Sequence, residues 1–316
     1  MSAWTTALDA ARITDPALRT AYTRQRALVL GYRRTAAVAL QALLPRPLVP
    51  HALAATAFMH HSDNVLEGKV PGTDWDGWAA ATRATLTTGA APGPGTDPLL
   101  RTVAHTADRH PALTTHITAY LETATADRDF TGFATESDYQ AYVDAYSLPA
   151  FLLVAGLVAP TDPEGAAAHR AACRSFIDAG QRLDFTNDLA EDLADGRLTL
   201  PADALVRHGV TRADLEQARD TAAVRALIAE QLDRAAVPHA AARATLPAAT
   251  PAPYRPLVRA LLTLDTLTLK AARAKGPALL RAPASPAPLP ALLALTREYL
   301  HTRRTPRPAP TPAATR

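Results

Sequence analysis

The 316-residue sequence has few aromatic side chains, one cysteine and no glycine-rich phosphate loop. The single cysteine, Cys173, excludes an internal disulfide and is typical of a reducing compartment. The N-terminal residues lack the basic start and long apolar run of a signal peptide, so we expect a cytoplasmic protein. The longest apolar stretch, residues 149–160, is too short to cross a bilayer, and no transmembrane segment is expected.

Lysine is almost absent, and nearly all the positive charge is arginine in a chain of net charge +3. No basic stripe with interleaved aromatic residues accompanies it, so nucleic acid is not an expected partner. Arginine is the better planar partner for phosphate oxygens, although a GC-rich coding sequence would produce the same preference.

Alanine and leucine dominate what is present, and apolar residues recur with helical periodicity between proline and glycine turns. The pattern predicts an all-α fold in a single domain over residues 1–300. The remaining segment, 301–316, is rich in proline, threonine and arginine, and we expect it to be disordered. Helices are predicted at about 16–27, 30–43, 50–67, 75–88, 97–126, 135–158, 164–193, 211–245, 253–275 and 288–303.

A first acidic stripe ends the helix predicted at 50–67. Asp63 and Glu67 are four residues apart and therefore lie on one helix face, about 6 Å apart along the axis. The same face is small or apolar further back, at Thr56 and Ala52, with His60 between. Two carboxylates at this spacing can share divalent cations.

A second acidic stripe runs through Gln181, Asp184, Asp188 and Asp192 at spacings of three, four and four. Carboxylates at such spacing usually lie on a solvated face and repel one another mildly. Here the line lies beside apolar residues, where uncompensated charge is costly unless a cation neutralises it. Oxygen-only ligands select a hard ion, so Mg²⁺ is the expected cofactor, bridging to substrate phosphate oxygens.

These residues resemble the squalene/phytoene synthase family. Gln181, Asp188 and the run AEDLADGRLTLP (190–201) match the family's second aspartate-rich motif without a gap. Asp63 and Glu67 fall on its first D-x-x-x-D motif, and Asp127 with TESDYQAY (135–142) is similar to its middle helices. The resemblance covers roughly residues 20–285.

The resemblance implies an isoprenoid synthase helical bundle with a central cavity and an allylic diphosphate held by Mg²⁺ between two helices. It implies metal ligation by Asp63, Glu67, Asp188 and Asp192, and catalytic roles for Asp63 and Asp188. Asp184 and His60 are the further catalytic candidates, either of which could act as the base, since histidine titrates near physiological pH. The candidate substrate-binding residues are Gln181, Arg34, Arg197, Thr56, Arg281 and Tyr142, with Arg33 beside Arg34 as a further candidate.

Several positions depart from the family pattern. His60 stands where the family commonly has arginine and Thr56 where it has tyrosine, both diphosphate-binding types; Glu67 and Asp184 also differ. One diphosphate and a neutral acceptor therefore fit better than two diphosphates. The preferred prediction is a prenyltransferase that moves a dimethylallyl or longer group to a small aromatic acceptor, such as a carbazole, in secondary metabolism.

Three alternatives remain open. The first is head-to-head condensation of two prenyl diphosphates, as in squalene or phytoene synthesis. The second is a helical binding protein without catalysis. The third is a metal hydrolase that uses the pair His60 and Asp63, although the other acidic helix offers only carboxylates and such an enzyme would need further histidines.

Overall fold

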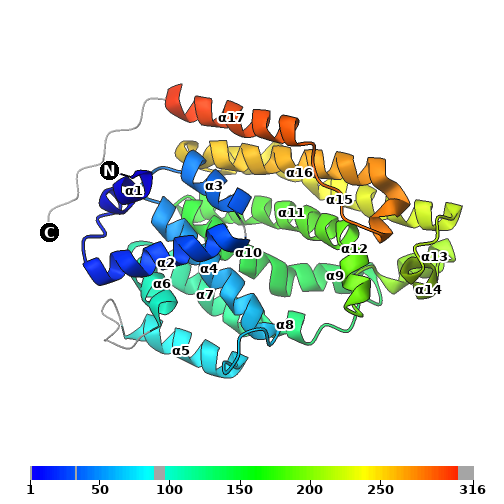
Figure 1. Ribbon diagram of the computed structural model, residues 1–316, viewed down its shortest axis with the longest axis horizontal. Helices are drawn as coiled ribbons and strands as arrows, with labels where there is room; N and C mark the ends of the chain where they lie inside the picture. The colour runs from blue at the N-terminus through cyan, green and yellow to red at the C-terminus, as the bar shows by residue number, and fades with distance from the viewer. Residues whose placement is uncertain (1, 33, 89–96, 305–316) are drawn as a thin grey trace.

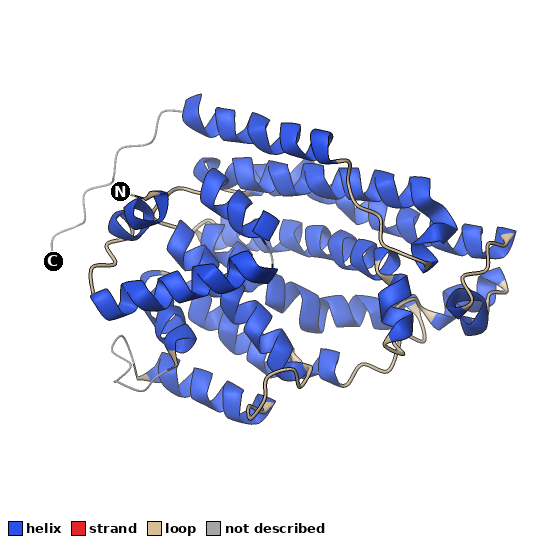
Figure 2. Ribbon diagram, in the orientation of Figure 1, coloured by secondary structure: helices blue, strands red, loops and turns tan. Residues whose placement is uncertain are grey.

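The computed structural model describes residues 2–32, 34–88 and 97–304, and within these ranges the chain is helical and forms no strand (Figure 1, Figure 2). The all-α prediction is confirmed. The α-helices are α1 (Ala3–Ala10), α2 (Pro16–Tyr32), α3 (Arg34–Leu43), α4 (Val49–Leu66), α5 (Trp75–Thr87), α6 (Pro98–Arg109), α7 (Ala112–Thr123), α8 (Thr125–Arg128), α9 (Glu136–Tyr142), α10 (Leu148–Ala155), α11 (Pro163–Asn187), α12 (Leu189–Ala194), α13 (Ala202–His208), α14 (Arg212–Glu216), α15 (Ala222–Ala249), α16 (Arg255–Lys275) and α17 (Pro288–Arg304). A π-helical turn η1 (Val143–Ser147) and 3-10 turns η2 (Gly156–Val158), η3 (Ala252–Tyr254) and η4 (Gly276–Leu280) join them.

Local capping explains where several helices begin. The Asp162 side chain accepts a hydrogen bond from the amide of Gly165, 2.7 Å away, and proline opens the first turn of α11. Thr135 and Asp138 form a reciprocal capping box at the start of α9. These side chains satisfy amides that have no partner within the helix, which sets the starts of two helices that carry site residues.

Some predicted boundaries were wrong. The segment 97–126 is broken by Pro111 into α6 and α7, because proline lacks the amide hydrogen that a continuous helix needs. The predicted helix 164–193 stops at Asn187 and restarts at Leu189, with Asp188 between them outside helical geometry. Residues 301–304 continue α17 and are not part of a disordered tail, while residues 305–316 lie outside the described residues.

The long helices form the body of the molecule. α11 and α15 pack along each other, α16 packs against α15, and α17 covers α16 on the outside (Figure 1). On the opposite side α4 packs against α2, α6 and α10. The largest group of buried apolar side chains joins α3–α7, α10 and the start of α16, and a second group surrounds α12–α15. The ends of α4 and α11 are therefore held by different parts of the core.

One continuous helical segment, Glu136–Val158, joins α9, η1, α10 and η2. Among the described residues it alone meets the length and composition of a helix that could cross a membrane, although 61% of its most apolar window is buried. Buried core helices meet the same criterion.

Pro149 lies just after the π-helical turn, where its missing amide leaves the carbonyl of Ala145 without its usual donor. The irregular turn thus lies directly before the position at which this proline removes a helix hydrogen bond.

Candidate active site

Asp63 lies near the end of α4, and two tyrosines from other helices hold its carboxylate. Tyr120 of α7 and Tyr146 of η1 both donate to Asp63 Oδ1, at 3.0 and 2.9 Å. Burial raises the pKa of Asp63 to about 6, although both hydrogen bonds act to lower it. Burial therefore outweighs the two donors, and the carboxyl group titrates close to neutral pH.

A second buried carboxylate, Asp127 at the end of α8, lies near Asp63. It accepts hydrogen bonds from the Tyr142 hydroxyl at 2.7 Å and from Arg197 Nη2 at 3.0 Å. The Arg197 guanidinium also lies 5.0 Å from the centre of the Phe130 ring. Two predicted site residues, Tyr142 and Arg197, thus meet at a carboxylate that was noted only as part of the family resemblance.

The second acidic face begins where α11 ends. Asp188 separates α11 from α12, and Asp192 follows one turn later, accepting a hydrogen bond from Thr199 Oγ1 at 3.1 Å. The pKa values of both aspartates are raised, mainly by burial. Asn187 exchanges hydrogen bonds with the backbone of Ala284, which ties this break to the segment after η4. The predicted straight line of aspartates is therefore bent at Asp188.

Electrostatic effects connect the two acidic faces. The charge of Asp127 raises the pKa of Asp63, while the charge of Arg197 lowers the pKa of Asp192. The Arg197–Asp127 ion pair thus stands between an aspartate of each face. The charge of Arg197 also acts to lower the pKa of Lys69, which lies just beyond α4. Asp63 and Asp192 therefore both lie near this ion pair, and the region between the two acidic faces is called the mouth below.

Glu67, the second acid of the first face, has a different environment. It caps the C-terminal end of α4, is exposed, and forms an ion pair of 2.7 Å with Lys69. Any cation at Glu67 would compete with this lysine. The predicted metal ligands are therefore unequal: Asp63 is enclosed, and Glu67 is already paired.

Two further predicted residues lie one and two turns before Asp188 on α11. Gln181 accepts a hydrogen bond from the buried Ser147 at 2.9 Å, which links α11 to the π-helical turn. Asp184 is exposed and lies close enough to Asp265 of α16 to raise its pKa. Burial, followed by this charge, brings the pKa of Asp265 to about 7. Asp265 is a candidate site residue that the sequence analysis missed.

The structure does not direct every predicted residue toward the acidic mouth. Thr56 is buried, and its hydroxyl donates to the Ala52 carbonyl at 2.8 Å, so in this arrangement it does not donate to a diphosphate. His60 stacks on Tyr32, with ring centres 3.4 Å apart and planes at 18°. A stacked imidazole of this kind packs as an aromatic ring, and its predicted catalytic role stays a prediction.

The outlying arginines are also dispersed. Arg281 is exposed and donates to the Ala218 carbonyl at 3.4 Å, and its predicted contact with diphosphate stays a prediction. Arg34 is exposed at the start of α3, and Arg33 lies outside the described residues. Of the arginines proposed as diphosphate ligands, Arg197 alone among the described residues is tied to the acidic faces.

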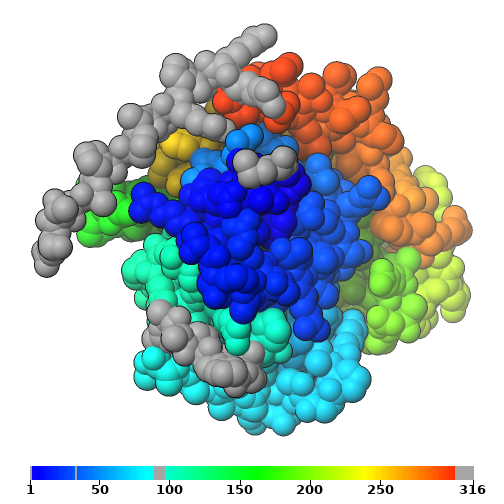
Figure 3. Space-filling view, turned by 60° about the vertical axis from the view of Figure 1, so that its left-hand side comes forward, coloured from blue at the N-terminus to red at the C-terminus, as the bar shows by residue number. Residues whose placement is uncertain are grey.

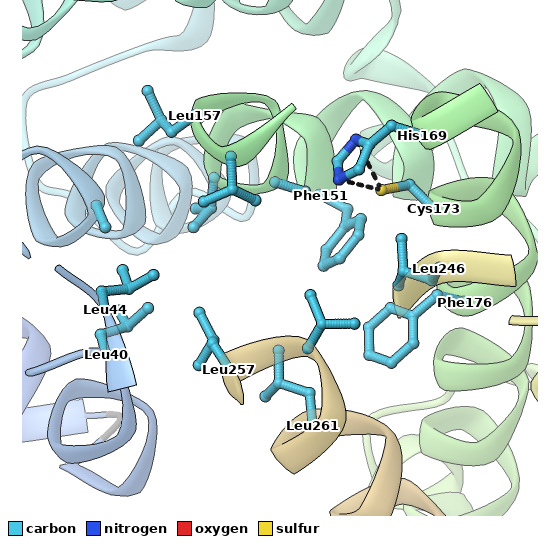
Figure 4. Close-up of a pocket in the computed structure, with 15 residues that line it drawn as sticks. Leu40, Leu44, Phe151, Leu157, His169, Cys173, Phe176, Leu246, Leu257 and Leu261 are labelled. Carbon is cyan, nitrogen blue, oxygen red and sulfur yellow. Dashed lines mark hydrogen bonds between the residues drawn. The ribbon is translucent and has the colours of Figure 1, made fainter. Parts of the chain in front are cut away.

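An apolar cavity of about 80 Å³ lies below the mouth, between α3, α4, α10, α11, α15 and α16 (Figure 4). Ala52 of α4 and Cys173 of α11 line it, each eleven residues before an aspartate of its own helix, or about 16 Å along the axis. Burial raises the pKa of the Cys173 thiol to about 12, as expected for a packed cysteine. The remaining lining is mainly aliphatic and aromatic: Leu40, Leu44, Phe151, Leu157, Phe176, Leu246, Leu257 and Leu261.

The donor set suits Mg²⁺ shared with a phosphate ligand. Within the described residues, no three carboxylate, histidine or cysteine side chains are grouped so that they could hold a metal ion. Mg²⁺ usually binds through one or two carboxylates and completes its shell with waters and substrate phosphates. Asp188 and Asp192 on one side, and Asp63 on the other, fit that requirement, because burial disfavours their charge until a cation is present.

Comparison with known proteins shows which family and which fold this chain resembles. The family model described as squalene/phytoene synthase matches residues 30–292. A search of the curated proteins gives no match. Similar solved structures include the squalene synthase HpnC from Alicyclobacillus acidocaldarius, at 24% identity and a TM-score of 0.66, covering 86% of this chain and 96% of that chain.

Two further structures are similar at 17% identity. A dehydrosqualene synthase in complex with a ligand has a TM-score of 0.74 and covers 91% of this chain and 98% of that one. YisP from Bacillus subtilis subsp. subtilis strain 168 has a TM-score of 0.65, with 89% and 96% covered. These likenesses show the isoprenoid synthase fold.

Proposed function

We propose, from the premise that this chain belongs to the squalene/phytoene synthase family, that it condenses two prenyl diphosphates head to head. The family acts on prenyl diphosphates, and this condensation is its typical activity. Transfer to an aromatic acceptor is the preferred prediction from the sequence. The comparisons instead favour the first alternative, head-to-head condensation, and none of the three similar structures described above is named for an aromatic substrate.

The observation that carries the proposal is the meeting of two acidic faces across the Arg197–Asp127 ion pair. Each face offers carboxylates for a cation that would hold a diphosphate. Arg197 lies between them with a guanidinium whose charge can approach either substrate. A mouth with two cation-binding walls and an arginine between them suits two diphosphates.

In the reaction, the carbon–oxygen bond of the first allylic diphosphate breaks, and the electron pair leaves with the diphosphate. Magnesium bound at the carboxylates would stabilise the developing negative charge. Arg197 lies where it can add a further positive charge. The double bond of the second prenyl chain then supplies the electrons of the new carbon–carbon bond, and loss of one proton neutralises the cation that this leaves. The second diphosphate departs in turn with its electron pair, and loss of a second proton gives the neutral product.

Other residues of the site would bind the prenyl chain and accept the proton in this reaction. The apolar cavity, about 16 Å along the helices from the aspartates, would receive the far end of a prenyl chain. When a proton is lost, the electron pair of the carbon–hydrogen bond forms a carbon–carbon double bond, and the proton passes to a carboxylate. Asp184, with Asp265 beside it, is the candidate acceptor, because it lies one turn before Asp188.

A specific feature favours transfer to a non-isoprenoid acceptor as the second candidate function. On the first face, Glu67 is paired with Lys69 and His60 is stacked on Tyr32, so this face offers less to a diphosphate than the second. A neutral aromatic acceptor would need no cation there. This candidate keeps the same ionisation step at Asp188 and Asp192.

One experiment separates the candidates. The purified chain is incubated with Mg²⁺ and farnesyl or geranylgeranyl diphosphate alone, and products and released pyrophosphate are quantified. Head-to-head condensation yields a C30 or C40 product with two pyrophosphates released for each product molecule. Pyrophosphate release only when an aromatic acceptor such as carbazole is added would overturn the proposal in favour of the second candidate. No release under any condition, matched by the Asp188→Asn variant, would favour a binding protein.

A further inference from the structure

Helix α16 leads from the apolar cavity to an acidic side chain. Leu257, Leu261 and Asp265 follow one another at spacings of four, so they lie along one side of this helix. Both leucines line the cavity, as Figure 4 shows. Asp265 therefore lies one turn beyond the cavity, on the side of α16 that forms its wall.

Helix α11 has the same arrangement. Cys173 and Phe176 line the cavity. Gly180 and Asp184 continue their side of the helix at spacings of four. Gly180 has no side chain, and a Cβ atom at this position would meet no atom from another described segment within 4 Å. An open space thus lies beside α11, between the cavity and Asp184 along the helix.

Asp184 and Asp265 lie close to each other one turn beyond Gly180. Burial, followed by the charge of Asp184, raises the pKa of Asp265 to about 7. Two neighbouring carboxyl groups in such surroundings do not both ionise readily, and one of them keeps or takes up a proton near neutral pH. Neither of them is among the four residues assigned to Mg²⁺.

The basic side chains near Asp265 are engaged elsewhere. Among the described residues, the Asp265 carboxyl group has no hydrogen bond and no ion pair. His239 and Arg243 of α15 instead contact the hydroxyl of the neighbouring Thr266, at 2.9 and 3.1 Å. Burial, helped by the charge of Arg243, lowers the pKa of His239, so this imidazole is neutral at pH 7. An ionised Asp265 is therefore a base without a counter-ion.

Asp265 faces the interior of the protein. Helix α17 packs along the outside of α16, where Arg259 pairs with Glu298 at 2.8 Å. The α17 segment, coloured orange to red, lies at the outer edge of the molecule in Figure 3. Arg259 lies about 120° around α16 from Asp265. The exposed Asp184 is thus the acidic neighbour that connects Asp265 with solvent.

We propose that Asp265 accepts the proton that is lost in the last, product-forming step and passes it to Asp184 at the mouth. The prenyl chain reaches the carboxylate through the space beside Gly180. The carbon–hydrogen bond next to the cationic carbon breaks, its electron pair forms a carbon–carbon double bond, and the proton binds an oxygen of Asp265. The proposal rests on the function proposed above, and it assigns the product class: a hydrocarbon closed by proton loss, not an alcohol formed by capture of water.

The test is the product ratio of Asp265→Asn. The variant is incubated with Mg²⁺ and farnesyl or geranylgeranyl diphosphate, and hydrocarbon, alcohol and pyrophosphate are quantified. Asparagine has the same shape but takes up no proton, so hydrocarbon formation should fall by about 100-fold. Water should then capture the cation, and pyrophosphate release should continue, because the cation-binding acids are intact. In the wild type, the alcohol fraction should rise as the pH falls below about 7, where Asp265 is protonated.

Two variants make this result specific. Asp233→Asn is the same exchange on the neighbouring helix α15, at an exposed acid paired with Arg273, and should keep the wild-type product ratio. Gly180→Leu fills the open space while Asp265 stays in place, so it should also raise the alcohol fraction.

A second measurement needs neither Mg²⁺ nor substrate. The carboxyl group of Asp265 titrates near pH 4 in the unfolded chain and at about 7 in the folded one. The folded state therefore holds the extra proton between these values, and the stability that it gives is lost as the pH rises. The melting temperature of Asp265→Asn, relative to that of the wild type, should increase from pH 4 to pH 7 and level off above.

Four results would overturn the proposal. They are a wild type whose product is an alcohol, an unchanged product ratio in Asp265→Asn, a shift in its Mg²⁺ dependence without a change in ratio, and a melting-temperature difference that is independent of pH. The proposed function fails by a different result, namely pyrophosphate release by the wild type only with an aromatic acceptor. The attacked ring carbon then loses the proton, and the same variants are compared by their ratio of prenylated acceptor to prenyl alcohol.

Discussion

The two acidic faces of the mouth are built differently. On α4, Asp63 is enclosed by two tyrosine hydroxyls, while Glu67, one turn on, is exposed and paired with Lys69. On the other side, Asp188 and Asp192 are both partly buried at the break between α11 and α12. The first face thus has one enclosed acid and one acid that is paired with a lysine, whereas the second face has two half-buried acids.

This difference indicates a division of roles. Two half-buried carboxylates one turn apart suit a cation that is present throughout the reaction. A carboxyl group with a pKa of about 6 gains or loses its charge near neutral pH, so the cation affinity of the first face should depend on pH. The second face should therefore hold the cation that assists ionisation of the first diphosphate. The pH-dependent charge of the first face should control how tightly a second substrate group is bound.

The largest expected effect is that of Asp188→Asn. It should lower kcat for pyrophosphate release by at least about 100-fold, because the second face loses half of its charge for the cation. Initial rates across a Mg²⁺ titration measure this effect. Asp195→Asn, at an exposed acid on the same segment, is the control and should stay within about twofold. Equal losses in both variants would remove the special role of Asp188.

A smaller effect is expected from the tyrosines of the first face. In Tyr120→Phe or Tyr146→Phe, Asp63 loses a donor that stabilises its charged form, so its pKa should rise above about 6 by about one unit. The acidic limb of the kcat/KM profile should shift to higher pH, with a clear loss at pH 6 and little change at pH 8. Tyr254→Phe, at a tyrosine of η3, should leave the profile in place. A uniform loss at all pH values would mean that the tyrosines serve packing alone.

The smallest effect should come from Lys69→Ala. The exposed pair with Glu67 contributes at most about 1 kcal/mol, so releasing Glu67 should lower the Mg²⁺ concentration at half-maximal rate by about fivefold at most. The double variant Lys69→Ala/Glu67→Gln should lose this gain. An unchanged midpoint in Lys69→Ala would show that Glu67 takes no part in holding the cation.

The features that could be predicted from the sequence are those encoded over one or two helical turns. The second face follows from spacings of three and four residues within one motif, and the all-α fold follows from the same periodicity. The break at Asp188 was missed, because it coincides with a tie to Ala284, nearly a hundred residues later in the chain. Thr56 was placed on the correct helix, but helical periodicity cannot show that its hydroxyl donates a hydrogen bond to the backbone of the same helix.

The remaining site features depend on contacts between distant segments. Tyr120 and Tyr146 reach Asp63 across 57 and 83 residues, and Arg197 reaches Asp127 across 70. Such pairings depend on how the helices pack, and no local sequence pattern predicts them. Asp265 had a detectable signal, since it is the single charged residue in an otherwise apolar and threonine-rich stretch from Ala260 to Leu269.

The π-helical turn Val143–Ser147 makes the site sensitive to chain length. It carries Tyr146, follows directly on Tyr142, and ends at the Ser147 that donates to Gln181. A π turn accommodates one residue more than an α turn, so deleting a single residue here would restore a regular helix. The part of the same helix before the deletion, Glu136–Tyr142, would then rotate by about 100° relative to α10, which turns Tyr142 away from Asp127 of α8. One inserted residue thus sets which hydroxyls reach both carboxylates, and substitutions alone would not reveal this dependence.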